Sequence, residues 1–327
     1  MTRIVAVGAG RMGRGIAQVF AFAGYAITLL DLKPRPAEAA ARLLREARDE
    51  VTENLDFMAS LNLFDGALKP AILGRIEGVA AGEAEAALTA AEIIFECVPE
   101  TIEAKREALQ RIGRLAPAEA IVASTTSSML SDELAAFVSR PQRFLNAHWL
   151  NPAYLIPLVE VSPAAGTSGE TTERVMALLE GIGKVPVKCT ASPGYIVPRI
   201  QAVAMNEACR MVEEGVATPE DIDRAIRARF GIRYATMGLV EFVDWGGVDI
   251  LYHASNYLKE ALGDERFQPP KTVAERMDRG ELGLKTGSGF YDFEKIDVAA
   301  YRRRKMGDFV ALLRHLELLP EPGEEKA

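Results

Sequence analysis

The stretch IVAVGAGRMG, residues 4–13, decides the fold of this chain, because it joins a short apolar run to a G-x-G-x-x-G pattern. Where such a pattern follows a strand and opens a helix, the first glycine permits a tight turn and the second admits a pyrophosphate. The third lets the helix pack against the strand. The start of the helix also favours phosphate charge. We therefore predict a dinucleotide-binding turn made by Gly8, Gly10, Arg11, Met12 and Gly13.

A second apolar run ends in Asp31, 18 residues after Gly13. A carboxylate at this point can accept hydrogen bonds from the adenosine ribose hydroxyls, and it repels a 2′-phosphate. Both effects favour NAD over NADP. Lys33 and Arg35 stand close by in the sequence and weaken the repulsion, so the strictness of the NAD preference stays open.

Strand and helix patterns alternate through the first half of the chain, which predicts a mostly parallel sheet with helices on both faces. The fold class we predict is α/β. A Rossmann-type, doubly wound NAD-binding domain spans residues 1–190, with a helical excursion near residues 37–64. After the turn signal at 191–194 the periodicity is mostly helical, which predicts an all-helical domain for substrate binding and dimerisation over residues 191–327. The predicted strands are Ile4–Val7, Ala26–Leu30, Glu92–Val98, Ile121–Ser124, Phe144–Ala147, Leu155–Val161 and Val185–Lys188.

The amino-acid composition argues against several classes of protein. The 327 residues include 49% apolar and 26% charged residues with a net charge of −8, which argues against a disordered chain and a basic nucleic-acid-binding protein. The three cysteines form no C-x-x-C pair, so we expect no zinc or other metal site. No apolar run is long enough to span a membrane, and the strand at residues 4–7 leaves no room for a leader. We therefore expect a cytoplasmic protein without nucleic-acid or membrane partners.

His148 and Glu160 are the candidate acid–base pair. His148 follows a predicted strand and precedes the turn signal Asn151-Pro152, which places it at the carboxyl edge of the sheet. Histidine has the right intrinsic pKa to take a hydroxyl proton while hydride leaves for a nicotinamide ring. Glu160 lies inside an apolar run, where a carboxylate is costly unless it is paired. A turn after His148 would bring Glu160 back beside it.

The hydroxyl run STTSS, residues 124–128, follows another predicted strand. Its side chains can bind a substrate oxygen, or they can cap the helix that begins near Ser131. The pattern alone does not decide between these two roles.

These segments together resemble the L-3-hydroxyacyl-CoA dehydrogenases and their relatives, the L-gulonate 3-dehydrogenase and lambda-crystallin group. The resemblance runs from about residue 3 to residue 293. It is carried by VGAGRMG (7–13), ECVPE (96–100), STTSS (124–128), HWLNP (148–152), PLVEV (157–161), SPGY (192–195) and KTGSGFY (285–291).

The resemblance implies an NAD-dependent enzyme that oxidises the 3-hydroxyl of a short L-3-hydroxyacyl-CoA, similar to 3-hydroxybutyryl-CoA, in fatty acid metabolism. It implies that His148 is the catalytic base and that Glu160 pairs with it. It also implies that Ser127 holds the 3-oxygen of the substrate and that Asn151 supports the His148 loop. Glu100 and Lys105 would approach the nicotinamide half of NAD. The resemblance also implies a homodimer formed through the helical domain.

Two departures from the family pattern leave the substrate open. Pro198 stands where the family has an asparagine that faces the substrate, and Leu239 stands where the family has a proline. One alternative is an NAD-dependent dehydrogenase of a free 3-hydroxy acid, L-gulonate-like or carnitine-like. The other is a non-catalytic, crystallin-like nucleotide-binding protein.

Overall fold

The computed structural model describes residues 2–319 of the chain. The described residues fall into two compact units that divide at Met205, within helix α8 (Val197–Glu213). The predicted division at residue 190 stays a prediction about folding domains.

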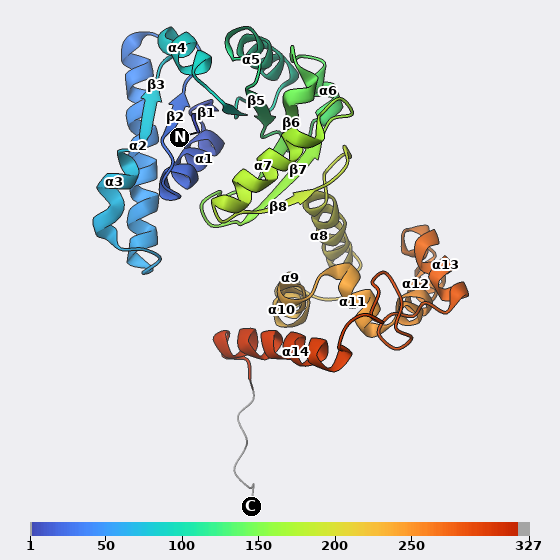
Figure 1. Cartoon of the computed structure of the whole chain (residues 1–327). Coiled ribbons are helices and arrows are strands. Elements are labelled where there is room, and N and C mark those ends of the chain that lie inside the picture. The colour runs from blue at the N-terminus through green and yellow to red at the C-terminus, as the bar shows by residue number, and fades with distance from the viewer. Residues whose placement is uncertain (1, 320–327) are drawn as a thin grey trace, which may run out of the picture. The chain divides into compact units, whose positions relative to one another are not determined.

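The first unit is built on one eight-stranded sheet with the strand order β3-β2-β1-β4-β5-β6-β7-β8 (Figure 1). Neighbouring strands are parallel except β6 and β7, which are antiparallel. The predicted α/β class with a Rossmann-type sheet is confirmed. The strands are β1 (Ile4–Val7), β2 (Ile27–Leu30), β3 (Ile76–Val79), β4 (Ile93–Glu96), β5 (Ile121–Ser124), β6 (Phe144–Trp149), β7 (Leu158–Pro163) and β8 (Val185–Lys188).

Helices cover both faces of the sheet, because successive strand residues point to opposite sides. In β1, Ile4 and Ala6 join an apolar cluster with α1, α2 and α7, whereas Val5 and Val7 join a second cluster with α4, α5 and α6. The helices of this unit are α1 (Arg11–Phe22), α2 (Ala37–Ser60), α3 (Lys69–Leu73), α4 (Ala84–Thr89), α5 (Ile102–Leu115), α6 (Ser131–Ala135) and α7 (Gly169–Gly181).

The predicted helical excursion near residues 37–64 corresponds to α2, which is followed by α3 and then by the edge strand β3. The sequence patterns did not single out β3 or α7. The predicted strand at 155–161 begins later, at Leu158, because Pro157 lies in the loop before it and has no N–H for the sheet.

The second unit is helical in the described residues, as predicted. Thr218 caps α9 by accepting a hydrogen bond from Asp221 N, as the sequence indicates. The pattern at 240–262 predicts one long helix, but Gly247, with φ of +115°, divides it into two. After α8 the helices are α9 (Pro219–Ala225), a π-helix (Ile226–Gly231), α10 (Ile232–Thr236), α11 (Leu239–Gly246), α12 (Val248–Leu262), α13 (Lys271–Arg279) and α14 (Val298–His315), and α10 packs on α14 (Figure 1).

Candidate active site

The glycine turn between β1 and α1 has the geometry that a dinucleotide needs. Gly8 has φ of +115°, and a Cβ there would lie 2.6 Å from the carbonyl oxygen of Cys97. A Cβ on Gly13 would lie 1.9 Å from Gly8 O, so only glycine allows α1 to pack this closely.

Gly10 differs from the other two glycines, because a Cβ there would meet no atom within 4 Å. It is the N-cap residue of α1, and no side chain caps the helix at this point. The first N–H groups of α1, which begins with Arg11 and Met12, therefore lie beside open space and are available to an anion. The turn fits the pyrophosphate of a dinucleotide.

Asp31 directly follows β2 and is nearly buried, with 5% of its side chain exposed. Its Oδ2 accepts a hydrogen bond of 2.7 Å from Arg35 Nε. The Asp31 carboxylate, which is predicted to bind the adenosine ribose, is therefore already paired with the guanidinium of Arg35.

A row of buried polar side chains crosses the sheet near the carboxyl ends of its strands. The strand register pairs Glu96 with Ser124, Ser124 with Asn146, and Asn146 with Ser162. All four residues are buried. Polar groups that share one face of a sheet core are expensive unless they bond to one another or serve a ligand.

Lys105 closes one end of this polar row from α5. Its fully buried Nζ lies 3.1 Å from Glu96 Oε1 and 3.2 Å from Glu100 Oε2. Ser124 Oγ donates to Glu96 Oε2 at 2.5 Å. The two predicted cofactor residues, Glu100 and Lys105, are thus in contact, and Glu96 is a partner that the sequence analysis did not single out.

Glu100 also organises the loop that carries Ser127. Its Oε1 accepts hydrogen bonds from Thr126 Oγ1 at 2.5 Å, from Ser127 N at 2.8 Å and from Ser128 N at 3.0 Å. Partial burial opposes ionisation, but these bonds and the charge of Lys105 lower the pKa of Glu100 to about 2. Glu100 is therefore an anion at any ordinary pH and keeps the loop fixed, with Ser127 exposed at its tip.

His148 and Glu160 lie directly opposite each other in the β6–β7 pair. His148 Nδ1 is 2.8 Å from Glu160 Oε2, and both side chains are buried. Glu160 Oε1 accepts the backbone N–H groups of Ile196 at 2.9 Å and Val197 at 2.8 Å, at the start of α8. A carboxylate on Nδ1 holds the ring in one orientation and leaves Nε2 to exchange protons.

Tyr195 is a further member of this group that the sequence analysis did not single out. Its ring stacks on the His148 imidazole, with centroids 4.8 Å apart and planes inclined by 13°. The only sequence signal was its place in the SPGY segment at 192–195.

Asn151 lies exposed in the loop that connects β6 to β7, three residues beyond His148. Lys184 anchors this loop, since its Nζ donates hydrogen bonds to the carbonyl oxygens of Ala153 and Ile156. Burial lowers the pKa of Lys184 to about 8. Lys184 thus ties the loop to the sheet through the carbonyl groups of the loop backbone.

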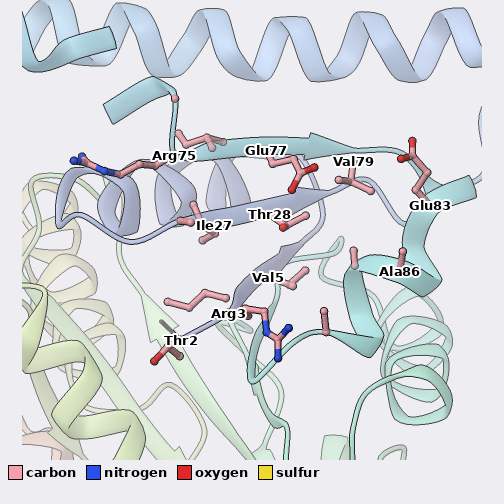
Figure 2. Close-up of a pocket in the computed structure, with 16 residues that line it drawn as sticks. Thr2, Arg3, Val5, Ile27, Thr28, Arg75, Glu77, Val79, Glu83 and Ala86 are labelled. Atoms are coloured by element: carbon pink, nitrogen blue, oxygen red, sulfur yellow. The ribbon is translucent and has the colours of Figure 1, made fainter. Parts of the chain in front are cut away.

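A cavity of about 750 Å³ lies elsewhere, between α4 and the amino-terminal parts of β1 and β2 (Figure 2). Figure 2 shows Val5, Ile27 and Thr28 on its strand side and the charged side chains of Arg75 and Glu77 along β3. Ligands in open parallel sheets bind at the carboxyl ends of the strands, which is where the glycine turn and His148 lie. We therefore assign the candidate site to that edge.

Within residues 2–319, no group of three or more acidic, histidine or cysteine side chains is arranged to hold a metal ion. No helix in the same part of the chain is both long and apolar enough to cross a membrane.

The arrangement can do a definite kind of chemistry. It combines a dinucleotide turn, an imidazole backed by a buried carboxylate, and a hydroxyl on the neighbouring strand end. Ser127 lies three residues beyond Ser124 on β5 and His148 lies two beyond Asn146 on β6, and Ser124 and Asn146 are register partners. Both groups therefore approach the same edge, as proton exchange with a bound alcohol or carbonyl requires.

Two family descriptions match the chain. Residues 3–192 match the NAD-binding domain of 3-hydroxyacyl-CoA dehydrogenase, and residues 194–293 match the C-terminal domain of the same enzyme. Together they cover most of the chain.

Individual proteins are similar over nearly the whole length. A probable 3-hydroxybutyryl-CoA dehydrogenase of Bacillus subtilis is 35% identical over 298 residues, which is 90% of this chain and 98% of that protein. The 5-formyl-3-hydroxy-2-methylpyridine 4-carboxylate 5-dehydrogenase of Mesorhizobium japonicum is 30% identical over 96% of this chain and 98% of that protein. The crystal structure of the 3-hydroxyacyl-CoA dehydrogenase of Archaeoglobus fulgidus superposes with a TM-score of 0.78 at 32% identity, over 98% of this chain and 100% of that chain.

Proposed function

The chain belongs to the 3-hydroxyacyl-CoA dehydrogenase family, and from this premise we propose how its residues oxidise the 3-hydroxyl of an L-3-hydroxyacyl-CoA with NAD. The enzyme class and the cofactor follow from the family. The observation that carries the residue roles is the 2.8 Å contact between His148 Nδ1 and the buried Glu160.

His148 Nε2 takes the proton of the substrate's 3-hydroxyl, and Glu160 stabilises the imidazolium that forms. Ser127 donates a hydrogen bond from its hydroxyl to the 3-oxygen and so polarises the C–O bond. Bound NAD supplies the acceptor for the hydride that leaves C3. In the reverse direction the His148 imidazolium returns its proton to the oxygen.

The glycine turn and Asp31 would hold the cofactor, and Glu100 with Lys105 would lie toward its nicotinamide half. Asn151 supports the loop that follows His148. The prediction of an NAD site is supported by the open space beside Gly10 and by the absence of a side-chain cap at the start of α1.

The proposed reaction is tested with a panel of 3-hydroxyacyl-CoAs of increasing chain length and of free 3-hydroxy acids, followed by NADH absorbance. We expect the short thioesters, such as 3-hydroxybutyryl-CoA, to give the highest kcat/KM. Free CoA should compete with a thioester substrate. Cofactor binding without NADH formation on any substrate would instead indicate a crystallin-like binding protein.

A free 3-hydroxy acid is the second candidate substrate, because Pro198 removes the side chain through which the family contacts the acyl group. The Mesorhizobium japonicum relative, whose name gives a pyridine carboxylate as its substrate, also matches a larger share of this chain than the Bacillus subtilis relative does. Indifference of the activity to free CoA would favour this candidate.

A CoA thioester needs basic residues for its phosphates, and the candidates in the helical excursion are Arg42, Arg45, Arg48 and Lys69, which are partly engaged in the structure. Arg42 pairs with Glu46 at 3.6 Å, Lys69 pairs with Asp56 at 2.6 Å, and Arg48 Nη1 donates to Leu73 O at 3.3 Å. Arg45 is exposed on the same helix. The two ion pairs lie at the surface and have small energy, so a thioester phosphate can displace them.

Asp31 sets the choice between NAD and NADP. Asp31→Ala should weaken NAD binding about tenfold, since it removes charge-assisted hydrogen bonds to the ribose. The same change should improve NADP binding, because it removes the repelling carboxylate and releases Arg35 toward a 2′-phosphate. Calorimetric titration with each cofactor measures both effects, and Arg35→Leu, which keeps the carboxylate, is the matched control. An unchanged ratio of the two affinities in Asp31→Ala would contradict this role.

The protein acts as a homodimer in fatty acid metabolism, in the cytoplasm. Support for a dimer through the helical unit comes from the large apolar side chains that this unit exposes. Sedimentation equilibrium tests the dimer by its mass. The exposed side chains of this kind include Val212, Val216, Ile226, Phe230, Val240, Ile250, Tyr257, Leu258 and Leu262.

A further inference from the structure

Tyr195 stands between the two sides of the candidate site. It is 6% exposed and has φ of +47°, a backbone conformation that non-glycine residues rarely adopt. Such a conformation persists only where the surroundings determine it. The surroundings here are the imidazole of His148 on the ring face and two hydrogen-bond partners at the hydroxyl.

The ring of Tyr195 covers one face of the His148 imidazole, with centroids 4.8 Å apart and nearly parallel planes. An aromatic face within about 6 Å attracts a cation. The stack therefore favours the protonated imidazole that exists after the proton has been taken from the substrate.

The hydroxyl of Tyr195 reaches the Ser127 loop. It donates to the carbonyl oxygen of Thr126 at 2.9 Å and accepts from Asn146 Nδ2 at 3.1 Å. Thr126 directly precedes Ser127, and Asn146 lies two residues before His148 on β6. One side chain thus connects the strand that carries the imidazole to the loop that carries the serine.

Glu160 holds the backbone of the same segment. Its Oε1 accepts from Ile196 N and Val197 N, the two residues after Tyr195, while its Oε2 contacts His148. The contacts form a closed ring through His148, Glu160, the start of α8 and Tyr195. Movement of Tyr195 is therefore coupled to movement of His148.

We propose that Tyr195 is a positioning residue of the reaction, whose ring stabilises the protonated form of His148 and whose hydroxyl fixes the Ser127 loop at the right distance from it. The inference rests on the proposed function, since it assumes that His148 and Ser127 act on one substrate oxygen.

The titratable groups around the stacked rings of His148 and Tyr195 are the Tyr195 hydroxyl itself, Glu160, Cys189 and Glu100. Burial is the main cause that raises the pKa of the Tyr195 hydroxyl, so Tyr195 stays neutral and acts through its ring and its hydrogen bonds. Glu160 faces His148 from β7, and Cys189 follows β8 with a thiol whose pKa is raised mainly by burial. Glu100, beyond the Ser127 loop, is ionised throughout the working range.

Two substitutions separate the ring from the hydroxyl. Tyr195→Phe keeps the stack and loses both hydroxyl bonds, so kcat should fall about fivefold while the acid limb of the kcat/KM profile stays in place. Tyr195→Leu also loses the stack. Since the imidazolium is then less stable, the neutral base persists to lower pH, and the acid limb should move down by about half a pH unit. Tyr25→Phe, at a tyrosine packed edge-on against Phe20, is the matched control.

NMR titration of the His148 ring provides a readout that does not depend on turnover. The chain has three histidines, so the signal is assigned by its loss in His148→Gln. The His148 signal should titrate at the same pH in Tyr195→Phe as in the wild type, and at lower pH in Tyr195→Leu.

A wild-type kcat in Tyr195→Phe would overturn the role of the hydroxyl, and an unmoved His148 titration in Tyr195→Leu would overturn the role of the ring. Tyr195→Phe is nearly isosteric, so it tests the hydroxyl even where Tyr195→Leu folds poorly. A wild-type enzyme that turns over no substrate in the panel would instead refute the proposed function, and the NMR titration would still test the stack.

Discussion

Replacement of His148 with glutamine should lower kcat by about 100-fold or more at saturating NAD and substrate. Glutamine can hydrogen-bond to the 3-oxygen, but it cannot accept the proton that leaves the hydroxyl. Because the site around His148 is buried and held by contacts from β7 and α8, the variant should fold and bind NAD as the wild type does. Stopped-time assays of NADH formation and a calorimetric titration with NAD measure the two quantities separately.

His253→Gln is the control for this change, because His253 lies on α12 in the helical unit, where its ring packs edge-on against Tyr252. It should retain wild-type turnover. If His148→Gln keeps a kcat near the wild-type value while NAD is saturating, His148 is not the base, and the proton must leave through another group.

The acid limb of the wild-type pH profile follows from the same role. In the direction of alcohol oxidation the base must be neutral, so kcat/KM should fall as pH decreases through the range in which the imidazole becomes protonated. Loss of this limb in His148→Gln, with the residual rate independent of pH there, is the expected signature.

The fold was predictable where local periodicity is strong. Short, mostly apolar runs that end at a glycine or a polar residue mark β1, β2, β4 and β5. The glycine spacing after β1 also predicts a tight turn there, because that spacing is compatible with only one turn geometry. Strand β3 was not predictable, because its residues include Glu77 and Gly78, which are rare in strands. Helix α7 was missed because its first turns are rich in threonine and glutamate and have little apolar periodicity.

The only pair in the candidate site that the sequence predicted is one that a single turn of the chain brings together. His148 and Glu160 are 12 residues apart, and a hairpin after His148 suffices to pair them. Glu96, Asn146 and Tyr195 depend on contacts between segments 28 to 69 residues apart in the chain. Those contacts are set by strand order and register, which no local pattern encodes.

The row of buried polar residues explains why the missed residues matter. Glu96, Ser124 and Asn146 occupy the same face of three adjacent strands, one step below the level of Ser127 and His148. Glu96 accepts a hydrogen bond from Lys105, Ser124 accepts one from the backbone N–H of Thr126, and Asn146 donates one to the carbonyl oxygen of Met129. The row therefore acts as a rigid base for the groups above it, and the predicted site residues owe their positions to it.

Glu160→Gln should be the most damaging conservative substitution in this chain, with kcat reduced on the order of 1,000-fold or more. Glu160 is fully buried, and both its oxygens accept hydrogen bonds, one on the side of His148 Nδ1 and one on the side of Ile196 N and Val197 N. An amide has only one accepting oxygen, so its NH₂ group must face either two backbone donors or the imidazole.

Each orientation of that amide has its own consequence. With the NH₂ toward α8, two partly buried N–H groups lose their acceptor, at about 1 kcal/mol or more each, and the melting temperature should fall by several degrees. With the NH₂ toward His148, Nδ1 must accept a hydrogen bond, so Nε2 carries the proton and can no longer act as a base. A control is Glu119→Gln, at an exposed carboxylate paired with Arg143, which should change neither quantity. Retention of both turnover and melting temperature in Glu160→Gln would mean that the carboxylate neither orients the imidazole nor anchors α8.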